Sequence, residues 1–549
     1  MAEYTIGVDF GTLSARAALV NIFNGQVAGT AEYIYPHGVM TEGLPDGWAL
    51  QYPQDYLDAL LSVIPEAVRH SGISAQHVVG IGVDFTANTA FPVDTQGKPL
   101  CLNPEWRQER NAYAKLWKHH AAQQRAEQIE AVAKARGESW LRRYGGRISG
   151  EWALPKLWEL LDEAPELYRT MHTWIEAGDW IVWQLTGREI RNGCAAGYKH
   201  FYHAENGYPK EEFYAAIDPG LRHVIRDKYT APVLPVGGKA GELTSEMAGK
   251  LGLRAGIAVA VAHVDAHACV PAAGICTAGQ MLAIMGTSSC LMVLSEDEHD
   301  VPGMCGAVQD GILPGFCGFE AGQSCVGDLF AWFCDHCVPS AYAQDAQLKG
   351  KSLHTYLTEL ADQLLPGESG LLALDWWNGN RSVLVDFDLS GLLMGMTLQT
   401  KPEEIYRALI EATAYGARVI VENFREHGVP VNAFYAAGGI SQKNPLVMQI
   451  YADVLNMPVR AVDAAEGGAL GSAIFAALAA GCHADAWEAV QAMGAPVKRV
   501  YHPIPDHICI YEQLYREYKR LHDLFGRTGC DTMKRLRAIK RDITGKEEK

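Results

Sequence analysis

One stretch near the start of the chain constrains the fold more than any other. It spans residues 5–20 and reads TIGVDFGTLSARAALV. Apolar residues alternate with Gly7 and Asp9, as in a strand, and Gly11-Thr12 interrupts the run before a second strand. We therefore expect a hairpin with a carboxylate at its rim. Asp9 can hold a hydrated Mg²⁺, and the turn can offer N–H groups and a hydroxyl to a phosphate. An ordinary hairpin with a surface aspartate is the alternative.

Related patterns return three times along the chain. Residues 78–94 read VVGIGVDFTANTAFPVD, which predicts strand, turn and strand in a second hairpin around Asp84. Residues 281–294 read MLAIMGTSSCLMVL and predict a hairpin around a Gly-Thr-Ser-Ser turn. Residues 434–441 read FYAAGGIS, a short strand that runs into a Gly-Gly turn before a helix. Turns of this kind, far apart in sequence, indicate a nucleotide held between two halves. The sequence contains no GxxxxGK[ST], so a P-loop kinase is excluded.

Length and charge exclude several classes of protein. With 549 residues the chain exceeds the usual size of one domain, so two large domains are expected. The net charge of −17 argues against nucleic-acid binding, which requires a basic surface. We expect no membrane helix, because ionisable side chains interrupt the apolar run at residues 256–274.

The cysteine content indicates the compartment. Thirteen cysteines lie in mostly apolar contexts and no secretion signal precedes them, which predicts free thiols in a reducing cytoplasm. Cys334 and Cys337 have the spacing of half a zinc site or of a redox pair. A helix-core sequence flanks them, so a structural role is favoured.

Ionisable residues follow a buried strand predicted at residues 258–262. His263, Asp265 and His267 alternate there, and a carboxylate at the end of such an apolar strand is costly unless it is paired or functional. The cluster therefore predicts that Asp265 is either paired or functional. A metal-binding hydrolase is the alternative.

Four other segments carry candidate residues. Lys199 lies in RNGCAAGYKHFY, for which we predict a loop entering a strand, and Glu320 precedes a predicted helix. If these two residues bind no ligand, Lys199 is a solvated lysine and Glu320 is a carboxylate at the start of a helix. Residues 105–136 predict a charged helical segment that contains Trp117. Residues 466–471, EGGALG, look like a phosphate loop but open a helix of small residues, so we predict helix packing there.

Two longer motifs resemble the signatures of the FGGY family of carbohydrate kinases, within the actin-like ATPase superfamily. The first is SGEWALPKLWELL, with Lys156 at its core and Ala153 as a departure. The second is SGLLMGMTLQTKPEEIYRALIE at residues 390–411, with Leu409 as a departure. The resemblance covers residues 4–480, most of the chain. Within the family, GVDFTANT, EAGDWIVWQLTG, AHVDAHA and EAGQSCVGDLFAWF are similar to the kinases that act on L-ribulose.

The resemblance implies an α/β fold with two actin-like ATPase domains of the ribonuclease H type and an interdomain cleft. Residues 1–274 would bind the sugar and carry the catalytic base, and residues 275–549 would bind the nucleotide. The implied reaction is ATP-dependent phosphorylation of L-ribulose at O5, a step of L-arabinose catabolism. Another ketopentose, such as D-ribulose or xylulose, is the alternative substrate. The implied partners are a small sugar, ATP and Mg²⁺, with a homodimer as a further expectation and no nucleic acid or membrane.

Residue roles also follow from the resemblance. Asp265 is the implied catalytic base, and Asp9 would position Mg²⁺ through water. The implied sugar contacts are Ala87, Trp117, Lys199, Asp265 and Glu320. The implied nucleotide contacts are Gly11, Thr12, Gly286, Thr287, Ser288, Gly438, Gly439, Ser441 and Asn444.

Two other classes of protein share part of this pattern. A non-enzymatic actin-like ATPase, such as a heat-shock chaperone or a filament protein, has the nucleotide turns but lacks the signatures around Lys156 and Glu411. A dinucleotide-dependent oxidoreductase requires GxGxxG after the first strand, where this chain has Asp-Phe-Gly-Thr.

Overall fold

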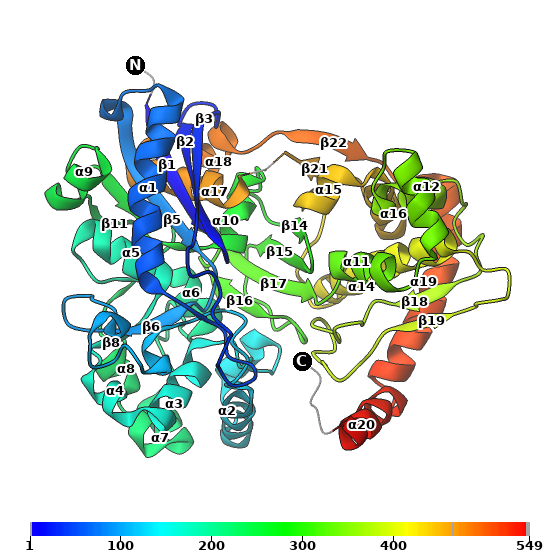
Figure 1. Ribbon diagram of the computed structural model, residues 1–549, viewed down its shortest axis with the longest axis horizontal. Coiled ribbons are helices and arrows are strands. Elements are labelled where there is room, and N and C mark those ends of the chain that lie inside the picture. Colours follow the sequence, from blue (N-terminus) through cyan, green and yellow to red (C-terminus); the bar gives the residue numbers. More distant parts are fainter. Residues whose placement is uncertain (1–2, 464–465, 545–549) are drawn as a thin grey trace.

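The first half of the chain folds around a mixed sheet that begins with the Asp9 hairpin (Figure 1). The computed structural model describes residues 3–463 and 466–544. Across the sheet the strands are β11 (Lys239–Glu242), β12 (Ala258–Ala260), β5 (Val78–Phe85), β1 (Tyr4–Phe10), β2 (Ser14–Asn21) and β3 (Val27–Ile34), and β13 (His263–Val264) pairs with β5. Strands β1 and β2 form the predicted hairpin, while β5 runs parallel to β1.

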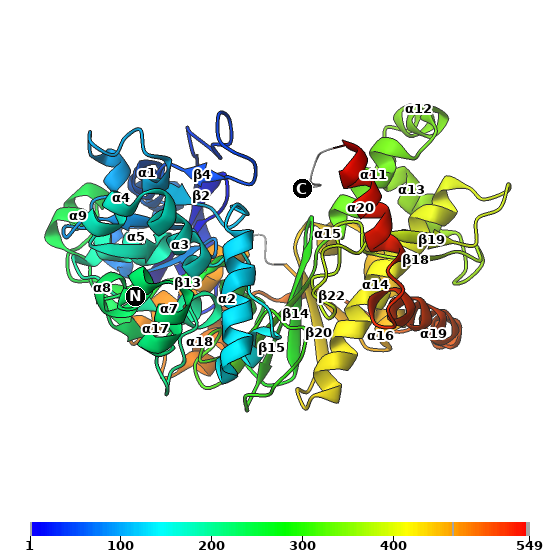
Figure 2. The ribbon, with the colours of Figure 1, turned by 90° about the horizontal axis from the view of Figure 1, so that it is seen from below.

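A second mixed sheet repeats this arrangement. Its strands, in order, are β16 (Gly306–Gln309), β17 (Cys317–Gln323), β15 (Ser289–Ser295), β14 (Gln280–Met285), β20 (Ala433–Ala437), β21 (Val459–Val462) and β22 (Val497–Tyr501). In each sheet an antiparallel hairpin is followed by parallel strands, β5 and β12 in the first and β20 and β21 in the second. We call the two sheets, with the helices that cover them, the first lobe and the second lobe; they lie side by side in Figure 2.

Helices cover both faces of the first sheet. They are α1 (Pro53–Ser71), α5 (Ala177–Thr186), α9 (Ser245–Leu251), α10 (Asp265–Ala272), α17 (Gly467–Ala479) and α18 (Ala486–Met493). The first lobe also carries a helical extension with two small sheets, a four-stranded one of β4, β7, β6 and β8 and a two-stranded one of β9 and β10. Its elements are β4 (Leu50–Gln51), β6 (Ala90–Val93), β7 (Ala114–Lys115), β8 (Thr173–Glu176), β9 (Arg191–Asn192), β10 (Val233–Leu234), α2 (Gln123–Arg136), α3 (Ala153–Glu163), α4 (Pro165–Thr170), α6 (Gly193–Lys199), α7 (Glu211–Ile217) and α8 (Val224–Lys228).

The second lobe has its own helical cover and hydrophobic core. Its remaining elements are α11 (Gly327–His336), α12 (Ser340–Leu348), α13 (Leu353–Asp362), β18 (Leu372–Leu374), β19 (Leu392–Met394), α14 (Pro402–Glu426), α15 (Gly439–Lys443), α16 (Pro445–Leu455), α19 (Pro505–Gly526) and α20 (Thr532–Thr544). Helix α14 forms because its apolar face repeats at helical spacing and Pro402 opens it.

Helix α17 belongs to the first lobe although it lies in sequence between strands β21 and β22 of the second (Figure 1). Its backbone lies directly on glycines of the first sheet. A methyl group on Gly7 would overlap the Ala469 carbonyl oxygen, and one on Gly82 would overlap that of Ser472. The EGGALG stretch thus opens a helix that packs closely on the sheet, which confirms the predicted role in helix packing. The strands of the first sheet precede residue 274 and those of the second sheet follow it, but α17 also follows it and packs on the first sheet. The domain boundary at residue 274 therefore stays a prediction.

Four predictions about local structure were wrong. Residues 78–94 do not form a hairpin, because β6 leaves β5 and pairs in the small sheet with β7 and β8. Residues 105–136 are helical mainly from Gln123 onward. Lys199 ends helix α6 instead of lying in a loop before a strand. Asp265 starts α10 instead of ending a strand. Glu320 lies inside strand β17 and precedes helix α11, as predicted.

Other expectations can be compared with the described residues. All thirteen cysteines are free thiols. Within the described part of the chain, no three side chains of His, Cys, Asp or Glu are placed so that together they could hold a metal ion. Across residues 3–463 and 466–544, no helix is both long and apolar enough to span a bilayer.

The contact between α17 and β5 predicts the effect of one small substitution. Gly82→Ala should lower the free energy of unfolding by about 1–3 kcal/mol, because the added methyl group has no room beneath the α17 backbone. Gly249→Ala in α9 is the control, since a methyl group there meets no atom within 4 Å and should stabilise the helix slightly. Urea unfolding at equal protein concentration measures both. An unfolding midpoint for Gly82→Ala equal to that of the wild type would contradict this account of the packing.

Candidate active site

Two carboxylates meet where β1 and β5 end. Asp9 and Asp84 are direct neighbours in the parallel pair, two residues beyond Gly7 and Gly82. Burial raises the pKa of Asp9, and burial together with the charge of Asp9 raises the pKa of Asp84 well above its ordinary value. Oδ1 of Asp84 is buried and has no hydrogen-bond partner among the described residues. The Ser472 hydroxyl donates to Asp84 over 2.6 Å.

The start of α17 closes over this acid pair. A methyl group on Gly468 would lie 2.8 Å from the carboxyl carbon of Asp9 and 3.1 Å from Oδ1 of Asp84, so the helix can start here only with glycine. Carboxylate oxygens are the protein ligands that Mg²⁺ prefers, and the ion usually keeps several waters. The acid pair therefore fits the predicted Mg²⁺ near Asp9. Asp84 was not predicted as a site residue, although the repeated GVDF at residues 7–10 and 82–85 was a signal for it.

The predicted phosphate turns lie at the ends of the two hairpins. Gly11 and Thr12 follow β1, and Thr12 accepts a hydrogen bond from the Trp117 indole over 3.0 Å. The turn after β14 holds Gly286, Thr287 and Ser288, with Gly286 and Thr287 exposed. Residues predicted for different ligands are thus in contact, because Trp117 was assigned to the sugar and Thr12 to the nucleotide.

A cavity of about 930 Å³ opens within the second lobe. It brings together four of the predicted nucleotide residues, namely Gly286, Thr287, Gly439 and Asn444. Its wall combines apolar side chains with carboxylates and amides that sequence reasoning missed, among them Phe330, Thr358, Glu359, Asp362, Ile440, Leu446 and Gln449. A planar base can lie against the apolar part while the polar groups bind ribose hydroxyls. The cavity therefore fits a nucleotide.

The Gly-Gly turn shapes this cavity in two different ways. Gly438 has φ of 92°, and a methyl group there would lie 2.6 Å from the Met285 carbonyl oxygen. A methyl group on Gly439 would meet no atom within 4 Å, so its open side is left for a ligand. Ser441 is buried and donates to the Gly438 carbonyl over 2.8 Å. Gly438, Ser441 and Ser288 do not line the cavity, and Gly438 and Ser441 hold the turn instead.

Glu320 is the centre of a charged cluster between the lobes. Its carboxylate lies 3.1 Å from the Lys199 ammonium of α6 and 2.7 Å from the Arg381 guanidinium. The ring of His267 from α10 lies 3.4 Å away. Burial alone would raise the pKa of Glu320, but Lys199, His267 and Arg381 hold it well below its ordinary value. The two predicted sugar contacts Lys199 and Glu320 are therefore joined, and Arg381 and His267 are additions that sequence reasoning missed.

Asp265 is half-buried in the first turn of α10, where the positive end of the helix favours a carboxylate. Its Oδ1 accepts a hydrogen bond from the Ala266 N–H over 2.7 Å. Burial, and then the charge of Asp9, raise the pKa of Asp265 to about 7. The charges of Glu320 and Lys199 also act on this pKa, so Asp265 is within electrostatic reach of both Asp9 and the Glu320 cluster.

The two neighbouring histidines, His263 and His267, are held in place by hydrogen bonds or by stacking on aromatic rings. Both ring nitrogens of His263 lie 3.1 Å from main-chain oxygens, of Val264 and Ile312, and its ring stacks on Phe475. His267 stacks on Tyr198. In the described residues these rings and Asp265 do not form a metal site, so the hydrolase alternative loses its support.

Ala87 and Trp117, the remaining predicted sugar contacts, lie on two segments of the first lobe. Ala87 belongs to the turn after β5, in which the hydroxyls of Thr86 and Thr89 are 2.9 Å apart. Trp117 follows β7 and is 39% exposed, so part of its ring is free to contact a ligand.

Comparison with known proteins agrees with this geometry. Residues 4–270 match the N-terminal domain of the FGGY family of carbohydrate kinases, and residues 281–480 match its C-terminal domain. The chain is 52% identical to a ribulokinase of Halalkalibacterium halodurans, with 98% of each chain covered. It is also 52% identical to a ribulokinase of Bacillus licheniformis, over 96% of this chain and 98% of that protein.

Solved structures share the fold at low sequence identity. A xylulose kinase from Rhodospirillum rubrum superposes with a TM-score of 0.79 at 24% identity, over 95% of this chain and 98% of that one. A glycerol kinase from Plasmodium falciparum, solved with ADP, superposes with a TM-score of 0.77 at 15% identity and the same coverage. The predicted α/β fold with two kinase domains is confirmed. The chain belongs to the FGGY family of carbohydrate kinases and is an enzyme that phosphorylates a sugar.

Proposed function

We propose that the protein transfers the γ-phosphoryl group of ATP to O5 of L-ribulose and forms L-ribulose 5-phosphate. The observation that carries the proposal is the Glu320 cluster beside Asp265, which offers donors and an acceptor to a polyhydroxy substrate next to a carboxylate. The relatives named ribulokinase support a pentulose as the substrate class. We expect the reaction in the cytoplasm, as a step of L-arabinose catabolism. A homodimer stays a prediction.

Asp265 is the proposed general base. In its ionised form it accepts the O5 proton while the O5–P bond forms and the bond between phosphorus and the ADP oxygen breaks. Its pKa of about 7 suits this role, because a base whose pKa is near the working pH is both largely ionised and able to take a proton.

The Glu320 cluster is the proposed sugar site. Glu320 stays ionised beside three nitrogen-bearing side chains and can accept a hydrogen bond from a sugar hydroxyl, while Lys199 can donate one. Ala87 leaves room for the sugar, and the exposed part of Trp117 offers an apolar face to it.

The second-lobe cavity is the proposed adenosine site, with the hairpin turns at Gly11 and Gly286 near the phosphates. The carboxylates of Asp9 and Asp84 would hold Mg²⁺ through water. When bound, Mg²⁺ neutralises charge on the phosphates. Closure of the lobes on both ligands would exclude water, which otherwise competes with the sugar for the phosphoryl group.

The substrate proposal is tested with a panel of sugars. L-ribulose should have the highest kcat/KM for ADP release among the four 2-ketopentoses, with glycerol and D-xylose as controls. Its hydroxyl pattern should match the donors and acceptor around Glu320. A higher kcat/KM with D-ribulose or xylulose would move the assignment to that sugar. A clear preference for glycerol would exclude a pentulose kinase.

The role of Asp265 is tested by Asp265→Asn, which keeps the size of the side chain but cannot take a proton. The variant should lower kcat by roughly 10²–10⁴-fold, the usual contribution of a positioned base. ATP affinity should change by no more than a few fold. The wild-type kcat/KM should fall below pH 7 as Asp265 is protonated, and the variant should lack this dependence. Asp55→Asn, which neutralises a buried carboxylate bonded to His37, is the control. A kcat for Asp265→Asn within about threefold of the wild type would identify another base.

The raised pKa of Asp265 also predicts a pH-dependent stability. Between the ordinary value of 3.8 and about 7, the unfolded chain loses this proton before the folded protein does. The residue therefore lowers stability progressively, by up to about 1.4 kcal/mol per pH unit, as pH rises through this window. Thermal unfolding should show Asp265→Asn close to the wild type at pH 4 and more stable at pH 8. A difference that is constant from pH 4 to 8 would contradict the raised pKa.

A further inference from the structure

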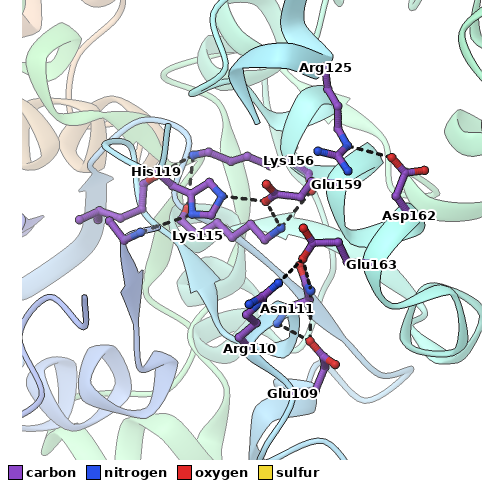
Figure 3. A network of polar contacts seen from close by, with 12 residues as sticks. Glu109, Arg110, Asn111, Lys115, His119, Arg125, Lys156, Glu159, Asp162 and Glu163 are labelled. Atoms are coloured by element: carbon purple, nitrogen blue, oxygen red, sulfur yellow. Dashed lines mark hydrogen bonds and ion pairs between the residues drawn. The ribbon is translucent and has the colours of Figure 1, made fainter. Parts of the chain in front are cut away.

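A fully buried lysine lies behind the proposed sugar site. Lys156 belongs to α3, and its ammonium donates to the main-chain oxygens of Asn88 over 2.7 Å and of Leu116 over 2.8 Å. A longer contact of 3.4 Å reaches the Lys115 carbonyl oxygen. Figure 3 shows this side chain beside the Lys115–Glu159 pair. A single donor group therefore joins two segments that are far apart in sequence.

Both segments carry a residue of the proposed sugar site. Asn88 directly follows Ala87, and Leu116 directly precedes Trp117. Asn88 has φ of 60°, a left-handed conformation that asparagine adopts more readily than most residues with a side chain. The bond from Lys156 to the Asn88 carbonyl fixes the position of this turn. The other end of the Trp117 segment is held by the bond of its indole to Thr12.

The next turn of α3 anchors the Trp117 segment a second time. Glu159 accepts hydrogen bonds from Lys115 over 2.6 Å and from His119 over 2.7 Å (Figure 3). The Lys115 ammonium also lies 4.8 Å from the centre of the Trp48 ring. Glu159 thus holds residues 115–119, the Trp117 segment, against α3. Lys156 also contacts this segment and, unlike Glu159, reaches the Ala87 turn as well.

A charged group at this position is a poor choice for stability alone. Removing an ammonium from water costs several kcal/mol, and an apolar side chain of similar volume is often as stabilising or more so. An ammonium has three N–H donors and no acceptor, so it can satisfy several carbonyl oxygens that converge on one point. The convergence of two pocket segments on Lys156 is therefore the feature to explain.

We propose that Lys156 is a positioning residue for sugar recognition, which sets the separation between the Ala87 turn and the Trp117 segment. The inference rests on the proposed function of these two segments. Without the ammonium, the oxygens of Asn88 and Leu116 lose their shared donor and the segments move apart. Sugar affinity then falls, while the nucleotide cavity in the second lobe is unaffected.

The experiment compares two buried lysines in the full-length protein. Lys156→Met keeps the aliphatic stem and removes the donor. Lys228→Met is the matched control, because Lys228 is also buried in the first lobe and donates to a main-chain oxygen, that of Met171, over 2.6 Å. Lys156→Met should raise the sugar KM and the calorimetric Kd of the sugar at least tenfold and leave the KM for ATP within twofold. Lys228→Met should change thermal stability only.

Hydrogen exchange gives a readout that does not depend on activity. Amides in residues 86–89 and 115–118 should exchange faster in Lys156→Met and at wild-type rates in Lys228→Met. If Lys156→Met does not fold, Lys156→Leu, which also lacks a donor, is measured with the same criteria. A folded variant with an unchanged sugar KM would overturn the positioning role. A wild-type enzyme that prefers another sugar refutes only the proposed substrate, and the comparison is then made with that sugar.

Discussion

The close approach of α17 to the first sheet is the contact on which the rest of the structure depends. The helix lies in sequence between strands β21 and β22 of the second lobe, yet its backbone lies on glycines of β1 and β5, which present no side chain. Two residues beyond these glycines, the same two strands carry Asp9 and Asp84 side by side. The start of the helix therefore meets both carboxylates, where its positive end favours negative charge. One packing contact thereby connects the two parts of the chain and builds the acid pair.

Several ionisable side chains are buried, and the neighbouring groups that offset or oppose their charge differ from one to the next. Glu320 is surrounded by positive groups and stays ionised, whereas Asp265 has acidic neighbours and a pKa of about 7. Lys156 has main-chain oxygens as its hydrogen-bond partners. Buried ion pairs contribute little to net stability, because desolvation offsets their attraction. Their arrangement between and behind the lobes is therefore better explained by ligand binding and orientation than by folding.

Local sequence signals predicted several elements and failed at others for identifiable reasons. The β1–β2 hairpin and α14 follow from alternation, turn residues and helical spacing within one segment. The segment after Asp84 has the same local pattern as a hairpin, but the small sheet offers β6 other partners. Asp265 follows an apolar run and still begins a helix, because the chain turns after the short strand β13.

The sequence by itself determined the turns of the β1–β2 and β14–β15 hairpins, the acidic residue near the end of the first strand, the Gly-Gly turn and the family, because each of these depends on residues close together along the chain. Only the tertiary structure decided that Asp84 faces Asp9, that Arg381 and His267 join Lys199 at Glu320, and that Lys156 ties the Ala87 turn to the Trp117 segment. These contacts join residues tens to hundreds of positions apart. Local periodicity carries no information about them, because such pairs are selected by the packing of whole helices and strands.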